Sequence, residues 1–210
     1  MIERITSIEE ESLKEISRKI GHAFCTFDYT KPNKGMTSSL NENQFSMLIY
    51  GQIKAAYLSG NLYTCDHKGY LILSTPKNKS TLKADLVQAY WMFRAFGVWG
   101  YLKQAAKLFQ AGPFQTEQMT FTHQPFVLVE MIAVLNEYQH QGVMSEMMKY
   151  AIETSQKLKL PCILSTDDPK KVEIYKHFGF GVKDVFMISL DYVHYDMIRR
   201  IDNENSESKN

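Results

Sequence analysis

Residues 130–148 read EMIAVLNEYQHQGVMSEMM, and this stretch decides the fold. It begins inside the apolar run PFVLVEMIAV (125–134), whose length and composition predict a buried strand. Apolar residues return at helical spacing from Val143 to Leu158. The polar residues between them, ending at Gly142, therefore join a strand to a helix N-terminus. Free backbone N–H groups at such an end carry partial positive charge and bind phosphate, although a plain turn with one glycine is the alternative.

The same alternation continues toward the C-terminus. CILST (162–166) has the composition of a second buried strand. Asp168 followed by Pro169 predicts a helix N-terminus, and Gly179 predicts its end. One or two further strands follow within 186–198. Strands that alternate with helices favour an α/β sheet with parallel character.

The N-terminal half contains mostly helical patterns. Ser7 and Glu10 match a capping box, and Asn41 with Gln44 matches a second helix start. We expect one domain over 1–200 with a disordered polar tail at 201–210. Its first half should comprise helices from 7 to about 20 or beyond and from 41 to about 59, a hairpin within 61–75, and a helical insertion over 81–112 that is interrupted at Gly97–Gly100.

The overall composition excludes several classes of protein. The 210 residues are 44% hydrophobic and 22% charged, with a net charge of +1, which argues against nucleic-acid binding through a broad basic face. Three cysteines form no disulfide framework, so we expect a reducing, cytoplasmic location. The acidic N-terminus lacks an export signal, and the apolar stretch 86–102 is too interrupted to cross a membrane. His22 and Cys25 are spaced like half a metal site without a second half, so we expect no metal.

Two polar residues stand in apolar surroundings. Glu130 lies within the strand VLVEMIAV, where a carboxylate is costly unless it is solvated, paired or used, and burial raises its pKa. Tyr175 lies four residues before Gly179 in the helix DPKKVEIYKHFGFGV. Either residue could have a structural role, Glu130 in a salt bridge with a lysine and Tyr175 as a core residue beside Val172 and Phe178.

Two segments, VEMIAVLNEYQHQGVMSEMMKYAIETSQKLKLPCILST (129–166) and KKVEIYKHFGFGV (170–182), resemble the GCN5-related N-acetyltransferase (GNAT) superfamily. The resemblance covers roughly residues 125–190. It implies a central mixed β-sheet flanked by helices, and transfer of an acetyl group from acetyl-CoA to a primary amine by direct attack in a ternary complex. Gln139 and Gly142 match the family's Q/R-x-x-G-x-G/A loop, whereas Met144 replaces the usual small residue.

The resemblance also implies roles for individual residues. Glu130 would act as the general base and Tyr175 as the general acid. Lys171 stands where many relatives carry asparagine, and it could reach a phosphate or simply be solvated. The implied coenzyme A site consists of backbone groups along the strand, amides of the loop and the lysine: Ile132, Ala133, Val134, Gln139, Gln141, Gly142, Val143, Met144, Ser145 and Lys171.

The acceptor is less defined. A small-molecule amine is the leading expectation, and a protein or peptide acceptor is the nearest alternative. The acceptor site of this family would fall near residues 24–29, the 86–102 block and Tyr192. Aromatic residues of that block could line the substrate pocket, form a homodimer face or pack in the core. A non-catalytic acyl-CoA sensor is a further alternative, favoured by Met144.

Overall fold

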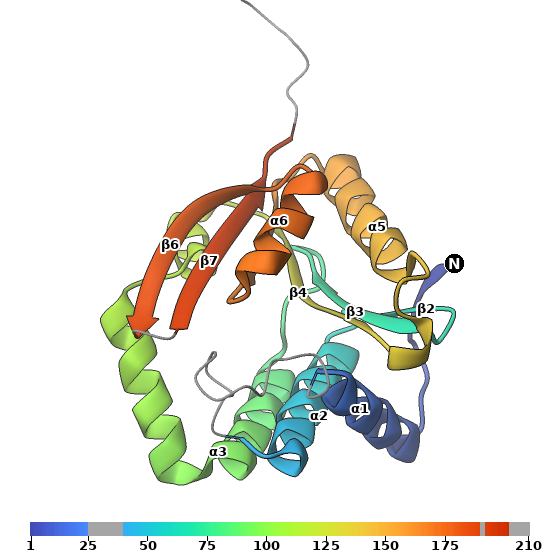
Figure 1. Ribbon diagram of the computed structural model, residues 1–210, viewed down its shortest axis with the longest axis vertical. Helices are drawn as coiled ribbons and strands as arrows, with labels where there is room; N and C mark the ends of the chain where they lie inside the picture. The colour runs from blue at the N-terminus through green and yellow to red at the C-terminus, as the bar shows by residue number, and fades with distance from the viewer. Residues whose placement is uncertain (25–39, 190–191, 202–210) are drawn as a thin grey trace, which may run out of the picture.

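The computed structural model describes residues 1–24, 40–189 and 192–201, with one mixed sheet at its centre (Figure 1). The seven strands lie in the order β1-β2-β3-β4-β5-β7-β6; the β4–β5 pair is parallel and the other pairs are antiparallel. The predicted mixed α/β sheet is therefore confirmed. The strand bounds are Ile2–Arg4 (β1), Leu62–Cys65 (β2), Gly69–Ser74 (β3), Val127–Val134 (β4), Cys162–Thr166 (β5), Gly181–Ser189 (β6) and Tyr192–Arg199 (β7).

Helices cover both faces of the sheet. In Figure 1, α1 and α2 lie below it and α5 lies above it, and α6 is on the same face as α5. Helix α3 packs along α2 and then extends to the edge strand β6. The helix bounds are Glu10–Phe24 (α1), Glu42–Leu58 (α2), Leu82–Ala111 (α3), Gln115–Phe121 (α4), Val143–Leu158 (α5) and Pro169–His177 (α6), with a 3-10 turn, η2, at Asn136–Tyr138.

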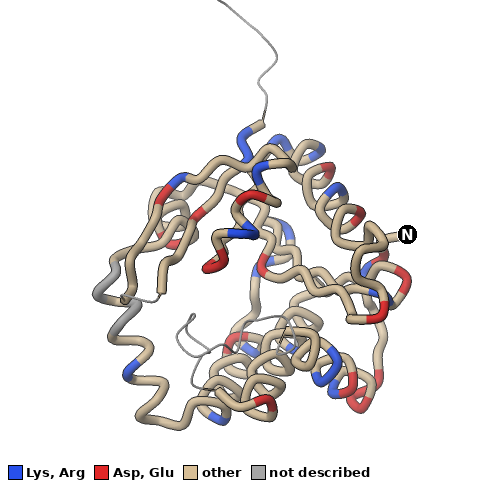
Figure 2. The backbone as a smooth tube through the Cα atoms, in the orientation of Figure 1, with Lys and Arg blue, Asp and Glu red and all other residues tan. Residues whose placement is uncertain are grey.

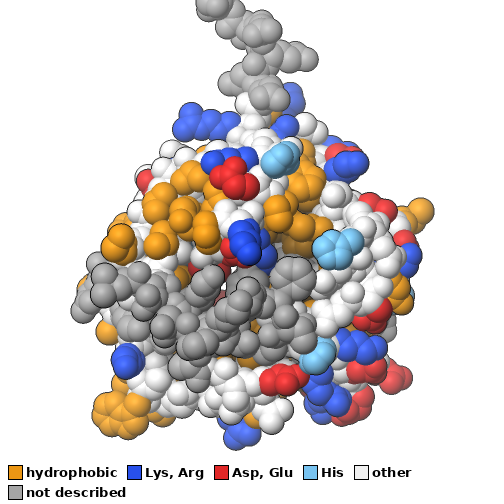
Figure 3. Space-filling model, in the orientation of Figure 1, with side chains coloured by type: hydrophobic (Ala, Val, Ile, Leu, Met, Phe, Trp, Pro, Cys, Tyr) orange, Lys and Arg blue, Asp and Glu red, His pale blue; other side chains and the backbone are white. Residues whose placement is uncertain are grey.

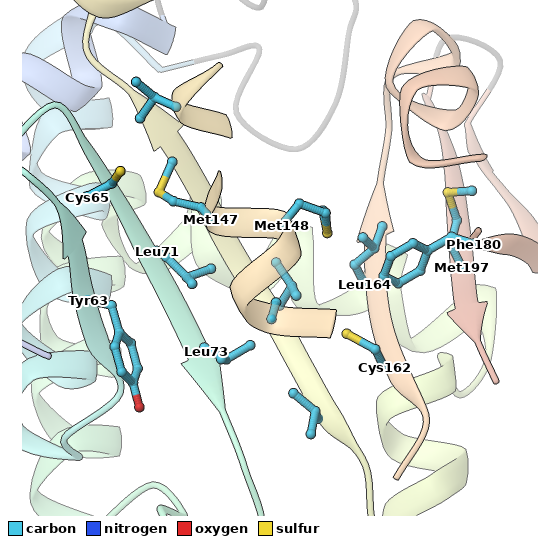
Figure 4. Packing of buried hydrophobic residues seen from close by; sticks show 14 of the residues in the cluster. Tyr63, Cys65, Leu71, Leu73, Met147, Met148, Cys162, Leu164, Phe180 and Met197 are labelled. Atoms are coloured by element: carbon cyan, nitrogen blue, oxygen red, sulfur yellow. The ribbon is translucent and has the colours of Figure 1, made fainter. Parts of the chain in front are cut away.

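Two apolar clusters hold these layers together. On the α5 face, Met147 and Met148 are fully buried and point toward the sheet, with Leu71 and Leu164 beneath them (Figure 4). The flexible thioether side chains fill the irregular space between a helix and a twisted sheet. On the opposite face, Ile53 of α2 is fully buried in the second cluster. The two clusters fix the sheet in position between its helices.

Several predicted element bounds are confirmed, but the first of the C-terminal strands begins at Gly181 and not within the predicted range 186–198. The capping box of α2 is present, because Asn41 and Gln44 exchange side-chain to backbone hydrogen bonds at 2.9 and 3.0 Å. The predicted start of the first helix at Ser7 is wrong, because α1 begins at Glu10. Strand β1 and helix α4 were not predicted, since three and seven residues are too short to show a period.

Helix α3 occupies the range of the expected helical insertion. It is broken at Gly97, whose φ of +68° is left-handed, as the glycine interruption predicted. The aromatic block divides into core and surface. Trp91 packs edge-on against Tyr50 with ring centroids 4.7 Å apart, whereas Trp99 is 84% exposed and Phe93 is also exposed.

The surface carries charges of both signs, interspersed along the helices and loops (Figure 2). None of the described helices is long and apolar enough to cross a membrane. Within the described ranges, no group of three or more His, Cys, Asp or Glu side chains could hold a metal ion. Residues 202–210 of the expected tail at 201–210 lie outside the described residues, as do residues 25–29 of the expected acceptor segment.

Candidate active site

The parallel pair β4–β5 opens into a fork. Residues 127–129 pair with 162–164, and the ladder ends there. Glu130 and Ser165 are the next residues of the two strands, so they stand at the opening of the fork on opposite arms. Beyond this point β4 remains paired with β3, and β5 with β7. Figure 1 shows the two halves of the sheet diverging.

A β-bulge at Glu130 changes which face of the sheet the following residues of β4 occupy. Leu73 of β3 lies opposite Val129, and the next pair along joins Ile72 to Met131, so Glu130 is the extra residue. Val129 belongs to the cluster under α5, but Met131 belongs to the cluster under α1 and α2. The bulge thus reverses which residues face which helices, and Glu130 faces the side of α1 and α2.

The Glu130 carboxylate is held by a short chain of hydrogen bonds. Ser74 Oγ, at the end of β3, donates to Glu130 Oε1. Asn61 Nδ2 donates to the same Ser74 oxygen at 3.0 Å and to the carbonyl of Asn78 at 3.0 Å. Among the described residues, no Lys or Arg lies within salt-bridge distance of Glu130, so the salt-bridge alternative finds no partner there.

The surroundings of Glu130 shift its ionisation. Although the residue is exposed, its carboxyl group lies in a recess densely surrounded by protein. This desolvation raises the pKa of the Glu130 carboxyl, and the hydrogen bond from Ser74 offsets part of the rise. A carboxylate whose pKa is moved toward neutrality can accept a proton more readily than an ordinary surface carboxylate.

A cavity of about 370 Å³ lies beside the C-terminal half of β4. It is bounded by that strand, the turn after it, the start of α5 and one face of α6. Met144 forms part of its wall, so the thioether does not fill the space. The lining residues are Ala23, Phe24, Ile132, Ala133, Val134, Tyr138, Gln139, His140, Gly142, Val143, Met144, Ser145, Lys171 and Ile174.

Nine of the ten residues expected to contact coenzyme A therefore line one cavity. Gln141 is the exception, because its side chain turns back and donates to the carbonyl of Glu137 at 3.0 Å. The predicted coenzyme site lacked the other five lining residues, which are Tyr138 and His140 from the turn after β4 and Ala23, Phe24 and Ile174 from α1 and α6. No pattern within 125–145 could find the last three, since they reach the cavity only through the packing of other elements.

The N-terminus of α5 opens into this cavity. Gly142 is its N-cap with φ +82°, and no side chain caps the helix. The backbone N–H groups of Val143, Met144 and Ser145 are thus at the uncapped end of a 16-residue helix. A Cβ on Gly142 would meet nothing within 4 Å, so the left-handed φ explains the glycine, rather than crowding by the protein.

Lys171 brings a positive charge to the same cavity. Burial lowers the pKa of the Lys171 ammonium, and Asp168 and Asp167 partly oppose this effect. Its Nζ lies 5.5 Å from the centre of the Phe24 ring. An anion entering the cavity would therefore meet a desolvated ammonium and an open helix N-terminus together.

Tyr175 lies on α6 and packs against the cluster under α5, as do Val172 and Phe178. Burial raises the pKa of the Tyr175 hydroxyl to about 12, with a smaller contribution from Asp168. A phenol with such a pKa stays protonated at neutral pH and can donate a proton or a hydrogen bond. Tyr175 thus packs as a core residue would, and its hydroxyl also keeps the proton that a general acid must donate.

Figure 3 shows the side chains on one face of the molecule, coloured by type. Hydrophobic side chains flank a small group of charged side chains of both signs, with histidines nearby. An apolar cavity with a few convergent polar groups is the usual form of a small-molecule site.

The comparisons with known proteins agree with this geometry. The model of the acetyltransferase (GNAT) family matches residues 105–180. No curated protein matches the chain significantly. Among solved structures, a histone acetyltransferase HPA2 and related acetyltransferase from Corynebacterium glutamicum is similar with a TM-score of 0.62 and 14% identity, over 95% of each chain.

Two further structures are similar at low identity. Arylalkylamine N-acetyltransferase 2 from Aedes aegypti has a TM-score of 0.58 and 8% identity, over 94% of this chain and 96% of that one. An N-acetyltransferase from Staphylococcus aureus Mu50 has a TM-score of 0.50 and 12% identity, over 94% and 99%. Such likeness establishes the fold, and the family model adds the segment that carries β4, α5, β5 and α6. Residues 105–180 therefore match the GNAT family of acetyltransferases, and the chain as a whole has the fold of these acetyltransferase structures.

Proposed function

We propose that this protein transfers the acetyl group of acetyl-CoA to a primary amine on a small molecule, by direct attack within a ternary complex. The observation that carries the proposal is the convergence of β4, the uncapped N-terminus of α5 and Lys171 on one cavity. Residues 1–200 would form one catalytic domain, with 81–112 as a helical insertion. The buried free thiols of Cys65 and Cys162 fit a reducing cytoplasm.

The coenzyme would occupy the cavity in two parts. Its pyrophosphate would accept hydrogen bonds from the amides of residues 141–145, where the helix dipole favours an anion. The side chain of Lys171 would add a charge-assisted contact. The pantetheine arm would run along Ile132, Ala133 and Val134, whose strand edge is free on the β5 side beyond the fork.

Two side chains would carry out the proton transfers of the reaction. The acceptor nitrogen attacks the thioester carbonyl, so that a C–N bond forms and the C–S bond breaks. Glu130 would take the proton that leaves the nitrogen, and Tyr175 would give a proton to the departing sulfur. The raised pKa of the Glu130 carboxyl and the protonated phenol of Tyr175 suit these opposite roles.

A non-catalytic acyl-CoA sensor would use the same cavity without the chemistry. Its supporting feature is Met144, in place of a small residue of the family loop. Because Met144 lines the cavity without filling it, crowding alone gives no reason for lost catalysis. A protein or peptide amine is the alternative acceptor, and it would use the same coenzyme cavity.

Calorimetry and a thiol-release assay separate these functions. We expect coenzyme A and acetyl-CoA to bind with micromolar affinity, and Lys171→Met to weaken both. We expect free thiol to appear with at least one member of a panel of alkyl and arylalkyl amines. No binding of either coenzyme would refute the proposal. Binding without thiol release for any amine or peptide would favour the sensor.

A further inference from the structure

A second polar cluster lies on the β5–β7 arm of the fork. Asp196 of β7 is fully buried and accepts three hydrogen bonds. Ser165 Oγ donates to its Oδ1 at 2.7 Å, the backbone N–H of Gln115 donates to its Oδ2 at 2.6 Å, and His194 Nε2 lies 3.0 Å from Oδ1. Burial alone would raise the pKa of the Asp196 carboxyl, but the bonds from His194, Ser165 and Gln115 outweigh it and lower that pKa.

The buried carboxylate fixes the state of the histidine ring. An ionised carboxylate can only accept, so the proton of a neutral His194 ring sits on Nε2. Its Nδ1 is then left with a lone pair. The ring is held by Phe114, with centroids 4.5 Å apart, and by Phe186 at 6.2 Å. The His194 side chain is 18% exposed, so a ligand can reach it from solvent.

The cluster shares a face of the sheet with Glu130. Leu164 and Met197 belong to the cluster under α5, so their neighbours Ser165 and Asp196, which pair across β5 and β7, face the other way. Asp196 and His194 are two residues apart on one strand and thus lie on that same face. Glu130 follows Val129 of the cluster under α5 and bonds to Ser74, which follows Leu73 of that cluster, so Glu130 lies on this same face. The fork therefore carries a carboxylate on one arm and an oriented imidazole on the other.

The charges around His194 are mainly negative. Asp167 follows β5 and interacts with His194, and burial raises the pKa of the Asp167 carboxyl. Tyr192 lies near Asp167. Asp184 of β6 pairs across from Asp196, but it is neutralised by Lys183 at 2.8 Å. This setting favours a cationic ligand over an anionic one.

We propose that His194, oriented by Asp196, removes the proton that an acceptor ammonium must lose before its nitrogen can attack. This role rests on the proposed acetyltransferase function and extends it to acceptors that arrive protonated. The first proton passes from the ammonium to Nδ1 of His194, which leaves a lone pair on the nitrogen. The second N–H proton goes to Glu130 as the C–N bond forms and the C–S bond breaks. His194 then releases its proton to solvent.

The decisive experiment compares two acceptors, an alkylamine that is charged at neutral pH and aniline, which is uncharged. For each acceptor, kcat/KM is measured across pH for the wild type and His194→Gln. With the alkylamine, we expect a loss of about 100-fold near neutral pH that shrinks as pH rises. With aniline, the ratio of variant to wild type should stay near one, because no prior deprotonation is needed.

Three controls keep the test interpretable. His177→Gln, at the exposed end of α6, should leave both ratios unchanged. His194→Ala should be rescued in part by added imidazole with the alkylamine. Imidazole nitrogen NMR of the wild type should place the His194 proton on Nε2, independently of any variant's folding.

Equal losses with both acceptors, or no loss with either, would overturn the role of His194 while leaving acetyl transfer intact. A proton on Nδ1 in the neutral ring would overturn it as well. If the wild type acetylates no amine at all, the proposed function itself fails and this inference fails with it.

Discussion

Ser74 donates a hydrogen bond to Glu130 at the point where a bulge separates the register of β3 and β4. The serine is itself held by Asn61. A hydrogen bond to a carboxylate stabilises the charged form, so this contact keeps the pKa of Glu130 lower than burial alone would set it.

Replacing Ser74 by alanine should therefore raise the pKa of Glu130 further. If Glu130 is the base, less of it is ionised at mildly acidic pH. We expect the acidic limb of the kcat/KM profile to move to higher pH by about one unit, the value of one charge-assisted hydrogen bond. Ser80→Ala, which removes an exposed bond to Asp85, is the matched control. If the acidic limb stays at the wild-type pH, the Ser74 hydrogen bond does not control the ionisation of the catalytic base.

Glu130→Gln should lower turnover without lowering the melting temperature at pH 8. The pKa of the Glu130 carboxyl is raised in the folded state. The protonated carboxyl therefore stabilises the folded state below the unfolded-state pKa, and this stabilisation is lost as the pH rises through the folded-state pKa. Glutamine carries no charge, so the variant should melt at an equal or higher temperature at pH 8 and lose that advantage near pH 4. Turnover should fall about 100-fold.

The exposed Glu153 of α5 provides the control for this pair of measurements. Glu153→Gln should change neither turnover nor the pH dependence of melting. Full turnover in Glu130→Gln would show that another group takes the proton.

Tyr175→Phe should lower kcat with little change in coenzyme affinity, because the missing hydroxyl acts only as the sulfur departs. We expect a loss of about 100-fold in acetyl-CoA turnover. Tyr63→Phe is a suitable control, since burial also raises the pKa of the Tyr63 hydroxyl while the ring packs against Tyr150 at 5.4 Å. Equal behaviour of the two variants would leave Tyr175 as a core residue.

Gly142→Ala tests the proposed phosphate loop, with a second glycine of positive φ as the control. Gly142 and Gly112 have φ of +82° and +95°, and a Cβ at either would meet nothing within 4 Å. Gly142→Ala should cost about 1 kcal/mol of stability, the cost of a left-handed residue. Gly112→Ala should cost at least as much, because its ψ of 179° belongs to a region almost restricted to glycine. Only Gly142→Ala should weaken coenzyme A binding, by about tenfold in calorimetry, as strain shifts the amides. Equal affinity in both variants would place the pyrophosphate elsewhere.

Met148→Ala should destabilise the protein without touching the cavity. The side chain is fully buried under α5, and such truncations cost about 2–5 kcal/mol. Thermal or denaturant unfolding measures the change. Lys149→Ala, at the next and exposed position of the helix, should have little effect.

The sequence by itself determined the local order of the site. The apolar run before Asn136 required a strand, the spacing from Val143 required a helix, and Gly142 predicted the left-handed residue between them. These signals are local because backbone periodicity and φ preferences act within a few residues. Together with the resemblance of residues 125–190 to the GNAT superfamily, they predicted the mixed sheet and nine residues that line one cavity.

Only the tertiary structure decided what surrounds that loop. The bulge at Glu130 depends on the register of β3, and the contacts of Ser74 and Asn61 depend on the same register. His194 and Asp196 come together with Gln115 from a part of the chain some 80 residues away. Register and packing of distant segments are set by burial summed over the whole sheet, so no short stretch of sequence encodes them.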